Sequence, residues 1–174
     1  MTIQKAKKFA IEKHKGQKRK FKGEPYFLHL KKVFRIVKED EKIEAKEVLA
    51  AAYLHDTLEE TNTTEEEIKE NFGNLTLKLV KELTIDKKEA KMFGKKEYLA
   101  NKLSDPNKIS DFALSIKLAD RLDNVSDLKN GPLNFKKRYI DETKHIIKNL
   151  EEKRKMSLSQ RELIKKIKEK IEWE

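Results

Sequence analysis

A histidine, an aspartate and two glutamates stand within six residues of one another, a combination that suits metal-assisted hydrolysis. His55 and Asp56 are adjacent, and Glu59 and Glu60 follow each of them by four residues. On a helix, residues four apart share one row, and adjacent residues diverge by about 100°. An ion held between the two rows would therefore have one carboxylate a turn along from each ligand.

Two further polar residues lie in apolar helical stretches of their own. His29 lies in PYFLHLKKVF and Asp120 in SIKLADRLDN, and a buried aspartate needs a partner or a metal ion. Asn124 follows Asp120 by one turn. With His55 and Asp56, the set offers two imidazoles and two carboxylates, which suits Mn²⁺, Fe²⁺ or Zn²⁺ with positions left for water.

A divalent ion at such a set lowers the pKa of bound water and supplies hydroxide at neutral pH. Cleavage of a phosphate ester needs that nucleophile, neutralisation of charge and a proton for the leaving oxygen. The predicted chemistry is metal-dependent phosphohydrolysis, with Glu59 and Glu60 as the candidate acid–base residues.

Each of these residues also has a purely structural interpretation. A His-Asp pair on a helix usually makes hydrogen bonds in the core or at the surface, and Asp120 could pair with Lys117 or Arg121. The two glutamates could simply end a helix. The remaining histidines, His14 and His145, are expected to be structural or exposed to solvent.

Helical periodicity dominates the chain, which has five Gly, three Pro and few alternating β-branched runs. The predicted fold is all-α, a single domain over residues 1–174 with a catalytic core at about 1–130 and C-terminal helices packed on it. About eight to nine helices are expected, at roughly 2–15, 25–39, 43–59, 64–71, 74–84, 95–103, 107–129, 133–155 and 158–172.

Local signals refine this arrangement. Prolines 25 and 106 are expected to open helices, and Thr64 with Glu67 forms a capping-box pattern. The segment 15–24 predicts a loop. The last helix has a thin apolar stripe that either packs on the rest of the chain or serves a contact in a homodimer, made of Leu163, Ile164, Ile167 and Ile171.

The composition of the chain limits the kinds of partner that we expect it to bind. The formal net charge is +10, but most lysines alternate with glutamates, which is typical of solvated helix faces rather than of a nucleic-acid site. One basic cluster lies in the predicted loop and is the candidate for gripping phosphate: Lys15, Lys18, Arg19, Lys20 and Lys22. The chain has no cysteine, no membrane-length apolar run and no signal-peptide pattern, so we expect a cytoplasmic protein without a membrane partner.

The order of several motifs resembles a known family. These are HKGQKR at 14–19, PYFLH at 25–29, LHDTLEE at 54–60, FG at 72–73, IKLADRLDN at 116–124 and KRYI at 137–140. Together they resemble the hydrolase domain of the RelA/SpoT family, a branch of the HD superfamily, and especially its stand-alone small alarmone hydrolases. The resemblance runs from the N-terminus to about residue 130, with the KRYI motif beyond it.

The resemblance implies an all-helical HD domain that removes the 3′-pyrophosphate of ppGpp or pppGpp. It implies Mn²⁺ bound by His29, His55, Asp56 and Asp120. It also implies a catalytic carboxylate at Glu59, a second at Glu60 where the family usually has aspartate, and substrate contacts at Arg19, Lys20, Lys91, Asn124 and Tyr139. Arg19 matches a residue that packs on the guanine base, a role that a flat guanidinium suits.

The chain departs from the family pattern in two places. The loop between residues 17 and 25 differs in length from that of the long enzymes, and Leu30 follows His29 where proline is common. The long enzymes carry a synthetase after this domain, so a chain that ends at Glu174 is expected to hydrolyse without synthesising. The same site could instead act on NADPH or a deoxynucleotide, or the chain could be a non-catalytic, basic nucleic-acid-binding protein.

Overall fold

The computed structural model describes residues 2–172, and within this range the fold is all-helical, as predicted. It has ten α-helices where eight to nine were expected, and one short 3₁₀ turn, η1 at Leu128–Asn130. The helices are α1 (Ile3–Lys13), α2 (Phe27–Glu39), α3 (Lys46–Leu54), α4 (Thr57–Glu60), α5 (Glu65–Leu83), α6 (Lys87–Phe93), α7 (Lys95–Ser104), α8 (Asp111–Asp127), α9 (Leu133–Lys153) and α10 (Leu158–Glu172).

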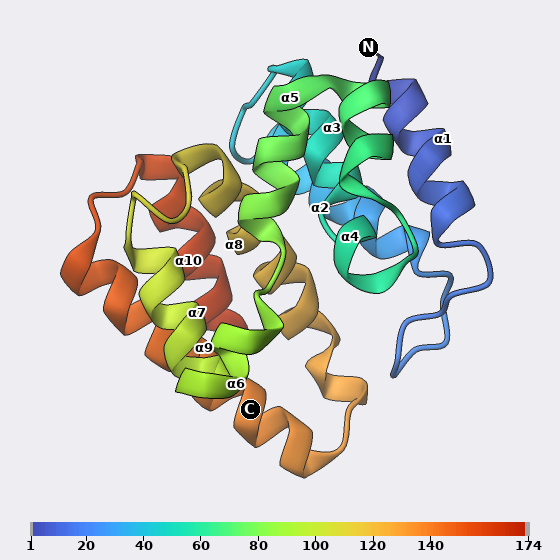
Figure 1. The fold of residues 1–174 in the computed structure, drawn as a ribbon. Helices are drawn as coiled ribbons and strands as arrows, with labels where there is room; N and C mark the ends of the chain where they lie inside the picture. Colours follow the sequence, from blue (N-terminus) through green and yellow to red (C-terminus); the bar gives the residue numbers. More distant parts are fainter. Residues whose placement is uncertain (1, 173–174) are drawn as a thin grey trace.

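Helix α8 lies between two groups of helices (Figure 1). On one side, α8 contacts α2, α3 and α5, and α1 packs on α3. On the other side, α8 contacts α9 and α10, and α7 packs on α9. Its apolar residues and several of its polar ones are buried. A polar residue on this helix can therefore face the α2–α3 side of the fold from the centre of the molecule.

The helix predicted over 43–59 is broken in the structure at His55 and Asp56. Helix α3 ends at Leu54, and a single turn, α4, begins at Thr57. The hydroxyl of Thr57 donates to the carbonyl of Leu54 at 2.7 Å, an alternative to the helical ladder that such side chains offer the backbone. The prediction of one continuous helix was wrong because the apolar residues continue through the break, so their period does not reveal it.

The predicted break near residue 73 takes the form of a kink within α5. Gly73 has φ 82° and ψ 172°, a conformation essentially restricted to glycine, so two helical segments meet there. The capping box that opens α5 is present, with Thr64 accepting from the amide of Glu67 and the Glu67 carboxylate accepting from the amide of Thr64.

The two helices that were predicted to begin at prolines begin further along the chain. Pro25 pairs with Lys18 in an isolated β-bridge, and α2 begins two residues later. Pro106 lies in a turn, and α8 begins at Asp111, where the hydroxyl of Ser110 caps it by accepting from the amide of Ala113. A serine that satisfies a free amide outweighs a proline that only presets one dihedral angle.

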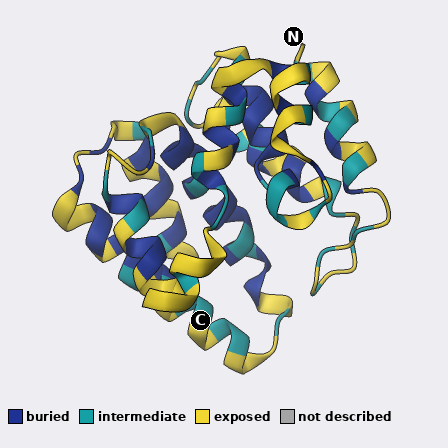
Figure 2. Ribbon diagram, viewed as in Figure 1, coloured by how far each residue is buried: buried dark blue, intermediate teal, exposed yellow. Residues whose placement is uncertain are grey.

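The last helix packs on the chain itself. Its apolar stripe is buried against α8, so the alternative that the stripe serves a homodimer contact is wrong: Leu163, Ile164, Ile167 and Ile171 are 0–4% exposed. Buried positions follow the inward faces of the helices on both sides of α8 (Figure 2).

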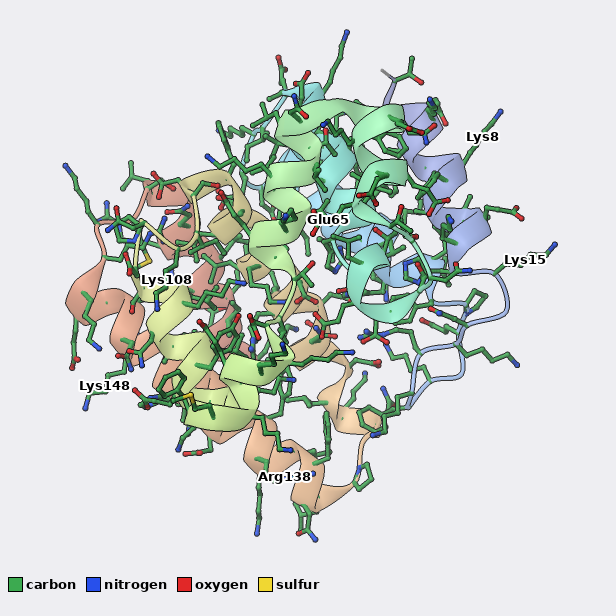
Figure 3. The ribbon with its side chains drawn as sticks, viewed as in Figure 1. Lys8, Lys15, Glu65, Lys108, Arg138 and Lys148 are labelled. Atoms are coloured by element: carbon green, nitrogen blue, oxygen red, sulfur yellow. The ribbon has the colours of Figure 1, made fainter. Side chains whose placement is uncertain are left out.

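Charged side chains project from separate parts of the surface, as Lys8, Lys108 and Lys148 show (Figure 3). Within residues 2–172, no helix combines the length and apolar character needed to cross a membrane.

Candidate active site

Four candidate ligands converge from three segments: α2, the turn between α3 and α4, and α8. Ligand atoms of His29, His55 and Asp120 lie within 4.8 Å of one another, and the three residues are buried. Oδ2 of Asp56 lies 2.9 Å from Nε2 of His55 and 3.6 Å from Nε2 of His29. Oδ1 of Asp120 lies 3.3 Å from Nε2 of His29 and 3.9 Å from Nε2 of His55. The two imidazoles and two carboxylates therefore face one another.

The outer nitrogen of each imidazole is committed to an acceptor. Nδ1 of His29 donates to Oδ2 of Asp123 at 2.7 Å, and Nδ1 of His55 donates to the carbonyl of Ala52 at 3.0 Å. In the neutral rings, these bonds leave Nε2 with a lone pair directed at the carboxylates, the tautomer that a metal ligand needs. Nε2 of His55 is buried, and among the described residues it has no well-aligned hydrogen-bond partner, although Oδ2 of Asp56 lies 2.9 Å away. The donor set thus fits a divalent ion.

The electrostatics of the cluster favour positive charge between the side chains. Burial would lower the pKa of His29, but hydrogen bonds to Asp120, Asp123 and Asp56 raise it to about 10. Burial would raise the pKa of Asp120, yet the ammonium of Lys117, 2.9 Å away, and the bond to His29 hold it well below its ordinary value. A site that so strongly stabilises a proton between these groups also stabilises a cation.

Tyr26, the residue before α2, fixes the orientation of Asp56. Its hydroxyl donates to Oδ2 of Asp56 at 2.7 Å, and its ring stacks on His14 with centroids 5.0 Å apart. Burial and the charge of Asp56 raise the pKa of Tyr26, so the phenol keeps its proton as a donor. The buried His14, predicted as structural or exposed, is thus a structural support, held by Gln17 at 2.7 Å.

A cavity of about 180 Å³ opens beside the ligands; we call it the acidic cavity. Its lining includes the carboxylates of Asp56, Glu59, Glu60, Asp120 and Glu142 and the cations of Lys95, Lys117 and Arg121. Oε2 of Glu59 accepts from the amide of Ile85 at 3.2 Å. Burial, together with Asp56 and Glu59, raises the pKa of Glu60. The two predicted acid–base residues therefore border the same space as two of the predicted ligands.

A second cavity, of about 120 Å³, adjoins the first, sharing Asn124 and Tyr139 with it; we call it the aromatic cavity. Phe21, Phe135, Leu128, Arg19 and Lys20 also line it.

Arg19 and Lys20 reach the aromatic cavity from the loop before α2. Nη1 of Arg19 donates to Oδ1 of Asn124 at 3.0 Å, and Nη2 lies 3.4 Å from Asp127. Nζ of Lys20 lies 5.3 Å from the ring centroid of Phe135. Of the basic cluster predicted to grip phosphate, Lys22 pairs with Asp127 at 3.0 Å, while Lys15 and Lys18 are exposed.

Tyr139 connects the two cavities. It stacks with Phe135 at 5.8 Å between centroids, and Arg121 lies 4.6 Å from its ring centroid on the side of the acidic cavity. Burial raises the pKa of Tyr139 to about 12, so its hydroxyl is available as a neutral donor. Lys91, predicted with Tyr139 as a substrate contact, is exposed on α6 and lines neither cavity; Lys95 lines the acidic cavity instead.

Sequence reasoning missed two residues that contact the candidate ligands, Tyr26 and Asp123, whereas Lys117, named as a possible partner of Asp120, does pair with it at 2.9 Å. Asp123 follows Asp120 by three residues, and Lys117 precedes it by three, so both share its face of α8. Charged residues on the buried face of a helix are the signal that could have found Asp123.

Comparison with known proteins places the chain among helical hydrolases. A family model described as HD domain matches residues 6–156. A Xenopus tropicalis protein named guanosine-3′,5′-bis(diphosphate) 3′-pyrophosphohydrolase MESH1 is 44% identical over 128 residues, which are 73% of this chain and 69% of that protein. An Aquifex aeolicus protein named guanosine-3′,5′-bis(diphosphate) 3′-pyrophosphohydrolase is 42% identical over 150 residues, 83% of this chain.

The chain spans 20% of the length of that Aquifex protein. Among solved structures, one described as a metazoan ortholog of SpoT that hydrolyses ppGpp superposes with a TM-score of 0.79 at 29% identity. The match covers 96% of this chain and 93% of that one.

Proposed function

Because the chain belongs to the HD-domain family, we propose that it hydrolyses guanosine alarmones, converting ppGpp or pppGpp to GDP or GTP and pyrophosphate. One observation carries the proposal: the acidic cavity, lined by Asp56 and Asp120 of the candidate ligands, adjoins the aromatic cavity through Asn124 and Tyr139. A nucleotide with a base and a 3′-pyrophosphate needs an aromatic site and a charged site side by side. The names of the relatives and of the metazoan structure support the same substrate.

We propose Mn²⁺ as the ion, held by His29, His55, Asp56 and Asp120, with Fe²⁺ or Zn²⁺ as substitutes. When bound, such an ion lowers the pKa of coordinated water to near neutrality and neutralises phosphate charge. Tyr26 and Asp123 orient two of these ligands through the hydrogen bonds described above.

The carboxylates of the acidic cavity divide the proton transfers. Glu59 is proposed to orient and deprotonate the attacking water, with its other oxygen steadied by the amide of Ile85. As the new P–O bond forms, the bond from phosphorus to the ribose 3′-oxygen breaks, and that oxygen needs a proton. Glu60, whose pKa is raised by burial and by its acidic neighbours, suits a proton donor.

The cations of the acidic cavity and the residues of the aromatic cavity position the substrate. Lys95, Lys117 and Arg121 face the space where the pyrophosphate would lie, and Tyr139 can donate a neutral hydrogen bond to it. Arg19 is proposed to pack on the guanine, with Lys20 beside the rings and Asn124 against the nucleoside. We propose that the 174 residues act as one catalytic unit, because α8 carries Asp120 while contacting helices of both halves.

A substrate panel tests this function. Purified protein with Mn²⁺ is incubated with ppGpp, pppGpp, GDP, NADPH and deoxynucleoside triphosphates, and the release of pyrophosphate and phosphate is followed. We expect pyrophosphate with GDP or GTP from the alarmones only, and its loss on chelation. Preference for NADPH or a deoxynucleotide would replace the alarmone with that substrate, and inactivity on all of them, with tight binding of RNA or DNA, would favour the non-catalytic alternative.

A further inference from the structure

One carboxylate on α8 joins a candidate metal ligand to the candidate base-binding arginine. Oδ2 of Asp123 accepts the Nδ1–H of His29 at 2.7 Å and lies 3.5 Å from Nη2 of Arg19. Its other oxygen, Oδ1, lies 3.7 Å from Nζ of Lys32. Asp123 is 8% exposed, so these contacts are only weakly screened by solvent.

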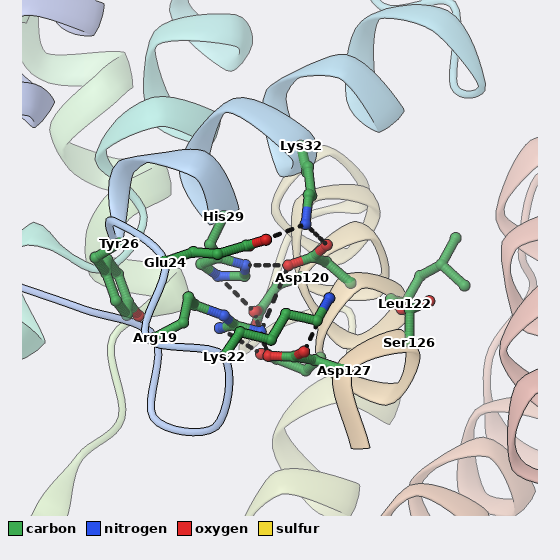
Figure 4. Close-up of polar contacts among 12 residues, drawn as sticks. Arg19, Lys22, Glu24, Tyr26, His29, Lys32, Asp120, Leu122, Ser126 and Asp127 are labelled. Atoms are coloured by element: carbon green, nitrogen blue, oxygen red, sulfur yellow. Dashed lines mark hydrogen bonds and ion pairs between the residues drawn. The ribbon is translucent and has the colours of Figure 1, made fainter. Parts of the chain in front are cut away.

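The neighbouring side chains converge on the same place from three segments (Figure 4). His29 and Lys32 come from α2, Arg19 and Lys22 from the preceding loop, and Asp127 from the end of α8. Asp127 pairs with Lys22 and with Arg19 but, in the described part of the chain, forms neither a hydrogen bond nor an ion pair with His29. Two acids one turn apart on α8 therefore hold Arg19, and one of them also holds His29.

A second connection runs parallel to the first. Arg19 donates to Oδ1 of Asn124 at 3.0 Å, and Nδ2 of Asn124 donates to Oδ1 of Asp120 at 2.6 Å. Arg19 is thus linked to two candidate ligands, each through one intermediate side chain. Asp123 links it to His29, and Asn124 links it to Asp120.

We propose that Asp123 is a positioning residue that fixes the metal-facing tautomer of His29 and, with the same oxygen, holds Arg19, so that ion binding and nucleotide recognition share one support. The proposal rests on the ligand set and base contact of the proposed function. Only an acceptor at Nδ1 leaves Nε2 of the neutral ring free to bind an ion, and a carboxylate in this place also increases the basicity of that ring. An arginine held at Nη2 and Nη1 presents a fixed face for stacking, which lowers the entropy lost when a base binds.

The test uses Mn²⁺ alone, so it does not depend on the identity of the nucleotide. The dissociation constant of Mn²⁺ is measured by calorimetry for the wild type, Asp123→Asn and Asp127→Asn. Asp123→Asn keeps one oxygen that can accept from Nδ1–H but loses the charge that increases the basicity of the His29 ring and holds Arg19. Mutation of a residue that supports a metal ligand typically weakens binding by about 10–100-fold, and this loss is expected for Asp123→Asn. Asp127→Asn, the matched control, removes the same charge one turn away and is expected to leave Mn²⁺ affinity unchanged.

A kinetic measurement tests the link to Arg19. Both variants are expected to raise KM for the nucleotide that the substrate panel identifies, because both loosen Arg19, while only Asp123→Asn also demands more Mn²⁺ for half-maximal rate. Wild-type Mn²⁺ affinity in Asp123→Asn, or an equal loss in Asp127→Asn, would overturn the proposal whatever the substrate proves to be. An unchanged KM in both variants would overturn its second half.

A melting experiment distinguishes weaker ion binding from a loss of folding. The rise in Tm caused by a fixed Mn²⁺ concentration reports binding even in a destabilised protein. That rise is expected to shrink in Asp123→Asn and to persist in Asp127→Asn. If Asp123→Asn does not accumulate as folded protein, Asp123→Glu takes its place, because it keeps the charge but moves it by one methylene. The Mn²⁺-induced rise in Tm is expected to shrink in this variant as well, and a full rise contradicts the proposal.

Discussion

The side-chain amide of Asn124 donates to Oδ1 of Asp120 at 2.6 Å, and that oxygen is the one that lies 3.3 Å from Nε2 of His29. Asn124 also lines both the aromatic and the acidic cavity. One amide therefore borders the proposed nucleoside position and steadies a candidate metal ligand at the same time. A change at Asn124 itself is consequently expected to affect both nucleoside binding and the ion.

Removing an imidazole from the cluster should remove the ion. His55→Ala takes away the buried Nε2 that faces the carboxylates of Asp56 and Asp120. We expect metal content and hydrolysis to fall together, to near zero, because a site with one ligand fewer binds its ion far more weakly. His145→Ala is the control, since His145 lies on α9 and pairs with Glu97 at 2.8 Å outside both cavities. Full activity in a metal-free His55→Ala protein would contradict the metal assignment.

Loss of the arginine at the aromatic cavity should act on substrate binding. A cation–π contact is worth about 0.5–2 kcal/mol, so Arg19→Ala is expected to raise KM for ppGpp by roughly 2- to 30-fold. The value of kcat should change less, because stacking on the base is similar in the ground and transition states. Arg161→Ala removes an arginine that is exposed on α10 and should leave KM unchanged. A KM that is the same in Arg19→Ala and the wild type argues against packing on the base.

The parts of the fold that sequence predicted well depend on local patterns. The capping box at Thr64 and the break at Gly73 each follow from residues within one or two turns, and both are present. The interruption of the helix at His55 was not predicted, because apolar residues continue through it and their period does not reveal a break. That interruption also means that Glu59 and Glu60 border the acidic cavity from their own turn, α4, rather than from the row of the ligands on one continuous helix.

Prediction of the site also succeeded where a local pattern was sufficient and failed where packing decides. Spacing and burial brought His29, His55 and Asp120 under consideration, and the structure has them together; their role as ligands stays a prediction. Lys91 and Lys95 lie four residues apart in a polar stretch with no apolar period to orient it, and both are exposed. Only the packing of α6 against α7 distinguishes the lysine that lines the acidic cavity from the one that does not.

The kink in α5 should depend on glycine. Gly73 has φ 82° and ψ 172°, and a Cβ placed there would meet no atom within 4 Å, so the cost of Gly73→Ala is backbone strain alone. That strain is about 1–3 kcal/mol, and chemical denaturation should show a loss of unfolding free energy of this size. Lys78→Ala, exposed on the same helix, should change stability by less than about 0.5 kcal/mol. Equal stability of the two variants would mean that α5 can straighten without loss.

The ion pair between α1 and α5 should make stability depend on acid pH. Nζ of Lys13 donates to Glu67 at 2.6 Å, and this bond, with that from the Thr64 amide, lowers the pKa of Glu67 from its ordinary value of 4.5. A lowered pKa in the folded state stabilises the fold above the ordinary value, and the contribution is lost as pH falls through the lowered pKa.

Glu67→Gln keeps the capping geometry but not the charge, so its Tm should lie below that of the wild type at pH 7, and the gap should close at pH values well below 4.5. Glu66→Gln, exposed beside it, should show no such gap. A gap for Glu67→Gln that is independent of pH would exclude the ionised carboxylate as its cause.

The carboxylate proposed to activate water offers the sharpest test of mechanism. Glu59→Gln keeps the size of the side chain and an oxygen that can accept from the amide of Ile85, so the fold around α4 should persist. What it loses is the ability to take a proton from water, and general acid–base residues typically contribute about 10²–10⁴-fold to kcat. We expect that loss in kcat, with Mn²⁺ content and Tm close to those of the wild type, because Glu59 is not among the proposed ligands. Glu70→Gln, exposed on α5 and outside both cavities, should behave as the wild type.

The structural alternative, in which Glu59 only ends α4 and accepts from Ile85, predicts little change in kcat. A Glu59→Gln enzyme that retains its metal and turns over at the wild-type rate would therefore assign the water to another residue, with Glu60 the next to be tested.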